Sequence, residues 1–213
     1  MARNKATSRQ RIVEEAARLF ELRGYHETTI DDIAASVGVA KPTIYRYVRS
    51  KQQVLEEIFE RLVTRLRRDL QRVASIHDPR SQLRELVRSS VVAVADLRPH
   101  FTIFFYEDRE LPMRSRRRFR QYARGINETV AAILERCQRA GVLRQDVQPK
   151  LAALFLLGMI TSMARWFDPS GPLNADQMAD QVLRFFAPDA PETDTMPLTG
   201  PPSARRKAHR KME

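Results

Sequence analysis

Four polar side chains between residues 41 and 47 are spaced to recognise a polyanion. Lys41, Thr43, Arg46 and Tyr47 would lie on the outer side of one short helix, with the apolar positions between them turned toward a core. The major groove of DNA accepts a helix that presents hydrogen-bond donors near its N-terminal end, and the base edges there distinguish all four base pairs. These residue types therefore predict recognition of duplex DNA.

A helix-turn-helix is the element that would hold this short helix in place. Thr29 with Asp32 fits a capping box for a helix that runs to about Val37. Gly38 suits the turn that follows, and Pro42 suits the first turn of a second helix. The order of helix, glycine turn and helix is that of a helix-turn-helix motif.

Apolar periodicity predicts helix along almost the whole chain. Thr7 with Gln10 fits a capping box at the start of the first helix. We expect an all-α fold of about nine helices, with an N-terminal three-helix DNA-binding unit and a larger C-terminal helical unit. The expected boundaries are residues 1–52, 53–187 and a basic tail, 188–213. The tail is poor in apolar residues, so it is predicted to be disordered and to raise non-specific DNA affinity.

Composition narrows the functional classes. The 213 residues carry 37 Lys and Arg against 26 Asp and Glu, a net charge of +11 that suits a polyanionic partner. The single cysteine, Cys137, excludes an intramolecular disulfide and a cysteine-based zinc cluster; we expect it to be a small core residue, with a redox switch as the alternative. No metal-ligand spacing, phosphate loop or nucleophile elbow is present, so we expect no metal, cofactor or catalytic site. The longest apolar stretch, 151–167, is about one residue short of a membrane span and contains Arg165, so we expect a cytoplasmic protein.

The segment around the predicted motif resembles the TetR family of bacterial transcriptional regulators. It reads TTIDDIAASVGVAKPTIYRYVRSKQQVLEEIF, residues 28–59, and departs at Val48, where many members have Phe. The resemblance implies base-edge contacts by Lys41, Pro42, Thr43 and Arg46. It implies phosphate contacts, which set the register without reading sequence, by Thr29, Tyr45, Tyr47 and Lys51. A core position for Tyr45 remains an open alternative.

The resemblance also implies a homodimer with a four-helix interface. The stretch 151–167 supports this, because it is apolar nearly all round and suits a helix buried on two sides. Small residues would let a partner helix approach, and these are Ala152, Ala153, Gly158 and Ser162. The expected companion is the later half of the helix between residues 113 and 140. The alternative is a monomer with a deep core.

A narrower resemblance concerns the C-terminal unit. The segments HFTIFFYEDREL and WFDPSGPLNADQMADQVLRFF are similar to those of TetR-type repressors of fatty-acid and sterol catabolism, which release DNA on binding an acyl-CoA. This implies a small-molecule effector, an apolar tunnel and cations for phosphates. The candidates are Phe104, Phe105, Tyr122, Ile126, Met159, Met163, Trp166 and Arg118, the last within a run formed by Arg114, Arg116, Arg117, Arg118, Arg120 and Arg124.

Each candidate has an alternative interpretation. The aromatic and methionine residues could be ordinary core, and the arginines could be a solvated face that pairs with Glu107 and Asp108. The predicted function is a ligand-responsive, DNA-binding transcriptional regulator, a repressor that a small-molecule effector releases from its operator. The alternatives are a regulator of a drug or aromatic-compound response and a non-specific nucleic-acid compactor, whose binding would ignore sequence.

Overall fold

The computed structural model describes residues 2–187, and side chains from Arg9 onward. Within that range the chain forms nine α-helices, two short 3-10 helices and no strand, which confirms the predicted all-α fold. The predicted tail, 188–213, lies outside the described residues. The α-helices are α1 (Ala2–Arg23), α2 (Ile30–Val37), α3 (Lys41–Tyr45), α4 (Lys51–Ala74), α5 (Pro79–Asp96), α6 (Arg98–Tyr106), α7 (Met113–Arg139), α8 (Pro149–Ser162) and α9 (Ala175–Phe186), with η1 (Asp108–Glu110) and η2 (Met163–Arg165) between them.

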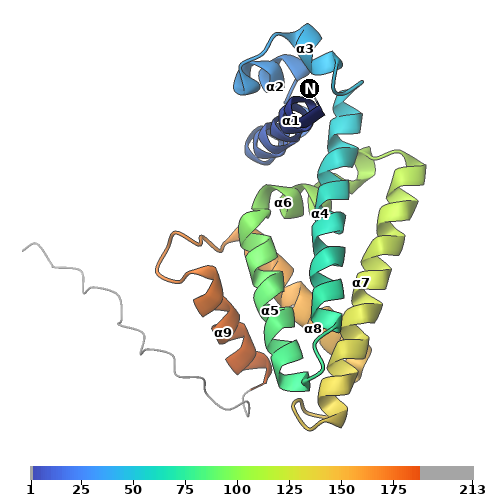
Figure 1. Cartoon of the computed structure of the whole chain (residues 1–213), viewed down its shortest axis with the longest axis vertical. Coiled ribbons are helices and arrows are strands. Elements are labelled where there is room, and N and C mark those ends of the chain that lie inside the picture. The colour runs from blue at the N-terminus through green and yellow to red at the C-terminus, as the bar shows by residue number, and fades with distance from the viewer. Residues whose placement is uncertain (1, 188–213) are drawn as a thin grey trace, which may run out of the picture.

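Helices α1, α2 and α3 form a small unit at one end of the molecule, with α3 at its outer tip (Figure 1). The inner face of α1 is fully buried, and α1 ends where Gly24 adopts φ +90°. Gly38 adopts φ +77° after α2, and its N–H and that of Val39 bond back to carbonyls of α2. Glycine permits this left-handed turn at low cost, so the turn directs α3 across α2.

Helix α4 runs unbroken from the small unit into the larger one (Figure 1). Its N-terminus is capped by Ser50, whose hydroxyl accepts a hydrogen bond from the Gln53 N–H at 3.1 Å. The first half of α4 completes the core of the small unit with Val54, Leu55, Ile58, Phe59 and Val63. That core also includes Ile103, Leu111 and Phe119, which come from α6, the following loop and α7. The expected boundary at residue 52 therefore falls inside one continuous hydrophobic core.

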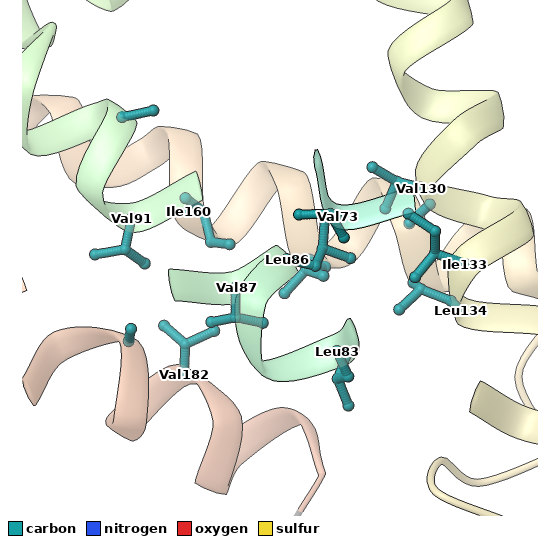
Figure 2. Packing of buried hydrophobic residues seen from close by; sticks show 14 of the residues in the cluster. Val73, Leu83, Leu86, Val87, Val91, Val130, Ile133, Leu134, Ile160 and Val182 are labelled. Atoms are coloured by element: carbon teal, nitrogen blue, oxygen red, sulfur yellow. The ribbon is translucent and has the colours of Figure 1, made fainter. Parts of the chain in front are cut away.

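The core of the larger unit lies between the second half of α4 and helices α5, α7, α8 and α9 (Figure 2). Val87 and Val91 of α5 face Val182 of α9, and Ile160 of α8 lies close to them. On the other side, α7 contributes its own row of buried residues, Val130, Ile133 and Leu134. Helix α8 packs against α7 within the chain.

One local prediction differs from the structure. Helix α1 begins at Ala2, so Thr7 and Gln10 lie within the helix and do not mark its start. The aromatic stretch after Leu97 forms α6, with Pro99 in its first turn, where a missing N–H costs no hydrogen bond.

Candidate nucleic-acid interface and apolar cavity

A capping box fixes the start of α2. The Thr29 hydroxyl accepts the N–H of Asp32 at 3.1 Å, and the Asp32 carboxylate accepts the N–H of Thr29 at 2.8 Å. The Thr29 hydroxyl also donates to Oδ2 of Asp32 at 2.5 Å, and this bond together with that from the Thr29 N–H lowers the pKa of Asp32 below its ordinary value. The hydroxyl of Thr29 is thus committed to the cap, and any phosphate contact would have to share it.

Helix α3 turns its polar side chains outward. Ile44 and Val48 are completely buried and fasten the helix to the core. Lys41, Pro42 and Arg46 are exposed. Thr43 is half-buried beside them. The residues predicted to meet base edges therefore lie together on one surface of the small unit.

Lys41 already has an anionic partner. Its Nζ lies 2.7 Å from Oδ2 of Asp31, and this hydrogen bond raises the pKa of Lys41 above its ordinary value. Both side chains are exposed, so water can replace either partner. Arg46 makes no ion pair with any side chain described from Arg9 to Ala187, and its guanidinium is available to a ligand.

The two tyrosines at and just after the end of α3, Tyr45 and Tyr47, occupy different environments. Tyr45 is 49% exposed, whereas Tyr47 is half-buried and packs against the core of the small unit. Helical position alone left Tyr45 at the boundary of the core; its exposure favours a surface role over a core role. Tyr47 retains only part of its ring on the surface.

Lys51 performs a structural task that sequence reasoning missed. Its Nζ donates hydrogen bonds to the carbonyl oxygens of Tyr25 at 2.8 Å, Thr28 at 3.0 Å and His26 at 3.2 Å. It also lies 4.4 Å from the centroid of the Tyr25 ring. An ammonium group has three N–H donors, so these carbonyls use all of them. Lys51 thus ties the α1–α2 turn to the start of α4, and the predicted phosphate contact would require those bonds to break.

An apolar cavity of about 280 Å³ lies in the larger unit. That volume is close to the lower end of the about 300–1,000 Å³ typical of small-molecule sites. Its walls come from α4, α5, α6, α7 and α8. The lining residues are Leu62, Val63, Leu66, Asp69, Leu70, Ser89, Ser90, Val94, Phe101, Phe104, Phe105, Ala123, Ile126, Asn127, Val130, Leu154, Leu157, Gly158, Ile160 and Thr161.

Three of the eight predicted effector-binding residues line this cavity: Phe104, Phe105 and Ile126. The others lie elsewhere for identifiable reasons. Met163 and the half-buried Met159 belong to the core, and Trp166 is 58% exposed beyond the end of α8. Tyr122 packs against Phe119 of α7 and under the guanidinium of Arg67.

The arginine run on α7 does not reach the cavity either. Arg118 forms an ion pair with Glu60 of α4 and lies over the Phe119 ring, 5.0 Å from its centroid. Arg120 lies 3.4 Å from Asp108, as the alternative interpretation expected. A separate shallow hollow of about 590 Å³ is lined by Met113, Arg114, Ser115, Arg117, Arg118 and Gln121.

The cavity and the small unit share a wall of aromatic rings. Phe104 lines the cavity and contacts both hydrophobic cores. Its ring centroid lies 5.1 Å from that of Phe59 on α4, which in turn lies 5.2 Å from that of Phe119 on α7. A molecule that moves Phe104 therefore acts directly on the core that supports α2 and α3.

Two buried titratable groups lie outside the cavity. His100 of α6 is 5% exposed, and both ring nitrogens lack a hydrogen bond within the described structure. Burial, with a smaller effect of Arg61, lowers its pKa to about 4. Cys137 is completely buried, and burial raises the pKa of its thiol to about 11, which favours the core interpretation over a redox switch. Within the described residues no three His, Cys, Asp or Glu side chains gather as metal ligands would.

An apolar face of α8 lies on the surface of the single chain. Leu151, Leu154 and Phe155 are 43%, 52% and 60% exposed, and Gly158 continues the same face one turn later. Phe185 of α9 is 78% exposed. None of the described helices combines the length and apolar character that crossing a membrane requires.

Comparisons with known proteins agree with this arrangement. The family model described as "Bacterial regulatory proteins, tetR family" matches residues 12–58, and that described as "Tetracyclin repressor-like, C-terminal domain" matches residues 77–188. The HTH-type transcriptional repressor KstR2 of Rhodococcus jostii (strain RHA1) is 30% identical over 186 residues, 84% of this chain and 89% of that protein.

Solved structures give the same result. The TetR family transcriptional regulator PfmR from Thermus thermophilus is similar with a TM-score of 0.73 and 30% identity, over 81% of this chain and 97% of that one. AibR in complex with isovaleryl coenzyme A and operator DNA is similar with a TM-score of 0.74 and 27% identity, over 85% of this chain and 98% of that one.

Proposed function

Because this chain belongs to the TetR family of helix-turn-helix transcriptional repressors, we propose that it acts as a homodimer that leaves its operator when a small amphipathic molecule fills the apolar cavity. The observation that carries this proposal is the position of Phe104. It lines the cavity and packs against the core of the DNA-binding unit. Since DNA is its partner, the protein works in the bacterial cytoplasm.

On the operator, α3 lies in the major groove. Lys41, Pro42, Thr43 and Arg46 face the base edges, and the exposure of three of them supports this assignment. Tyr45 and the surface edge of Tyr47 contact phosphates, as does Thr29 to the extent that its capping bonds allow. Lys41 leaves Asp31 and binds DNA instead. Lys51 keeps its bonds to the α1–α2 turn and holds that turn in place.

The exposed apolar face of α8 forms the dimer interface together with α9. Leu154, Phe155 and Phe185 are large apolar residues that water would otherwise cover, and Gly158 lets a partner helix approach. Such a dimer would hold its two α3 helices about 34–36 Å apart, so that they enter successive major grooves.

The effector changes that spacing through α4. This helix has 24 residues and is therefore about 36 Å long, so a tilt of about 5° about its C-terminal end moves its N-terminal end by about 3 Å. Leu62, Leu66 and Leu70 of α4 line the cavity, and Phe59 lies one turn before them. The shift requires the effector to bind the DNA-free arrangement more tightly than the DNA-bound one.

An acyl-CoA thioester is the effector class that we favour. The apolar walls suit an acyl chain, and AibR, a structural relative, was solved with isovaleryl coenzyme A and operator DNA. The phosphates would remain outside the cavity, where arginines are abundant on α4, α5 and α7. A neutral drug-like or aromatic effector would use the same apolar walls without the arginines.

The proposal is tested by fluorescence anisotropy of the full chain on DNA from upstream of its own gene, titrated with octanoyl-CoA at near-physiological salt. We expect preference for this DNA over random sequence and release by octanoyl-CoA, but not by free CoA or octanoate. Phe104→Ala should keep the DNA preference and lose the release, whereas Trp166→Ala, outside the cavity, should retain both. Binding that ignores sequence would contradict the regulator and favour a non-specific compactor.

A further inference from the structure

One carboxylate interrupts the apolar wall of the cavity. The face of α4 that lines it reads Leu62, Leu66, Asp69 and Leu70, and Asp69 is only 8% exposed. A buried carboxylate is costly unless its oxygens accept hydrogen bonds. Asp69 therefore places a charged group at the edge of an otherwise apolar wall.

Only one oxygen of Asp69 is engaged by a hydrogen bond. Arg65 donates its Nε–H to Oδ2 at 2.6 Å and holds Asp96 with its other nitrogens at 3.2 Å. The nearest cation to Oδ1 is Arg72 at 3.6 Å, beyond hydrogen-bond distance, and Arg72 pairs with Glu85 at 3.0 Å. Among the described residues Oδ1 therefore receives no hydrogen bond and remains an open acceptor.

The neighbouring polar groups add acceptors to this end of the cavity. Ser89 and Ser90 of α5 donate their hydroxyl hydrogens to carbonyl oxygens of their own helix, at 2.6 Å and 2.7 Å. Their oxygens can still accept. Among the lining side chains, Asn127 of α7 alone carries N–H donors, and it makes no hydrogen bond within the described structure. This end of the cavity thus offers more acceptors than donors, and a ligand that brings a donor gains a hydrogen bond there.

A second hollow, of about 340 Å³, adjoins the cavity at Asp69. This hollow shares Asp69 and Ser89 with the cavity and is otherwise lined by Arg65, Arg68, Arg72, Arg88 and Val92. Three of its arginines are matched by carboxylates: Arg65 by Asp69 and Asp96, Arg72 by Glu85, and Arg88 by Asp176 at 2.7 Å. The fourth, Arg68, is exposed and makes no ion pair with any described side chain. A ligand carboxylate beside Asp69 would therefore meet the charge of Asp69 with Arg68 as the one unmatched arginine of this hollow.

We propose that Asp69, with Ser89 and Ser90, is the subsite that selects the effector by a hydrogen-bond donor, a hydroxyl or an ammonium group, and that rejects a carboxylate. This inference rests on the proposed effector cavity and makes its ligand class narrower. An uncharged ester or thioester that carries a hydroxyl group satisfies the subsite, whereas the corresponding free acid does not. Like charges in a poorly hydrated site repel far more strongly than they do in water.

The test uses three probes of equal chain length, 1-octanol, octylamine and octanoate, with binding to the DNA-free protein measured by calorimetry and by thermal shift. The wild-type chain should bind octanol and octylamine at least ten-fold more tightly than octanoate. Asp69→Asn preserves the shape and removes the charge, so octanoate should bind more tightly and octylamine more weakly, with their ratio changing at least ten-fold. Asp146→Asn is the matched control, because Asp146 is exposed, pairs with Arg144 and lines neither hollow, and it should keep the wild-type order.

Equal binding of octanoate and octanol to the wild-type chain, binding of none of the three probes, or an unchanged ratio in folded Asp69→Asn would each overturn the proposal. The wild-type ranking is independent of whether the variant folds. Release of DNA is measured separately with the same probes. Probes that bind in the expected order without releasing DNA would leave the subsite intact and contradict the proposed regulatory function.

Discussion

Replacing Lys51 by methionine separates a structural lysine from a phosphate-binding one. Methionine keeps much of the apolar length of the side chain and removes the ammonium that bonds to the carbonyls of Tyr25, His26 and Thr28. A net hydrogen bond contributes about 1 kcal/mol, and the contact with the Tyr25 ring adds about 0.5–1 kcal/mol. Three such bonds and the ring contact together predict a loss of about 3.5–4 kcal/mol in the free energy of unfolding.

Urea unfolding of the full chain, followed by circular dichroism at one protein concentration, measures this loss. With a denaturant slope of about 1–3 kcal/mol/M, the midpoint should fall by about 1 M or more. Lys41→Met is the matched control, because Lys41 is exposed on the same unit and its removal should leave the midpoint unchanged while weakening DNA binding.

DNA binding at several salt concentrations completes the experiment. Loss of one phosphate contact reduces the slope of log K against log salt concentration by about 1, whereas loss of a structural support reduces the folded fraction and leaves the slope of the folded protein unchanged. A Lys51→Met protein with the wild-type unfolding midpoint and a reduced salt slope would refute the structural role and restore the phosphate role.

Three further changes test other parts of the molecule. Gly38→Ala should cost about 1–2 kcal/mol of stability, because φ is +77° there. An added Cβ meets nothing within 4 Å, so this cost comes from the backbone alone, and thermal unfolding compared with Gly38→Asn, which tolerates this φ better, measures it. The pKa of His100 is about 4 in the folded state and near 6.5 in the unfolded state, so stability is highest above pH 6.5 and falls as the pH drops toward 4, by about 2 kcal/mol at pH 5. His100→Leu should flatten that part of the profile of urea-unfolding free energy against pH, and an unchanged profile would contradict the assignment. If the proposed dimer forms through α8, Phe155→Asp should give a monomer in light scattering, whereas Leu22→Asp, on the exposed side of α1, should leave the dimer intact.

Local patterns in the sequence were sufficient to predict most of the helix ends. Thr29 with Asp32 caps the helix expected from that pair. Ser50 with Gln53 and Asn174 with Gln177 have the same spacing and cap α4 and α9. Gly24 and Gly38 end helices with positive φ. Such patterns succeed because both partners of each hydrogen bond lie within one turn of chain, so no knowledge of distant elements is needed.

The cavity could be predicted only in part, because its walls depend on how distant helices meet. Apolar spacing identifies the inward face of a helix but not what lies opposite. Met163 therefore proved to be core and Trp166 surface, although both lie on an apolar segment. Asp69 is visible in the sequence as a charge within an apolar stripe, a pattern that indicates a polar group at a buried surface. Lys51 offered none, since its carbonyl partners lie more than 20 residues earlier in the chain.

The shared core of the small unit has a consequence for how such proteins can be recombined. Phe59, Ile103 and Phe119 complete the hydrophobic interior beneath the helix-turn-helix, yet they lie beyond the expected boundary at residue 52. Exchanging residues 1–52 between relatives would therefore place the DNA-binding helices of one protein on the core residues of another. The side-chain volumes in the shared core would then no longer match. Replacing the few surface residues of α3 is a simpler way to change operator preference, because the shared core and the apolar cavity then remain unchanged.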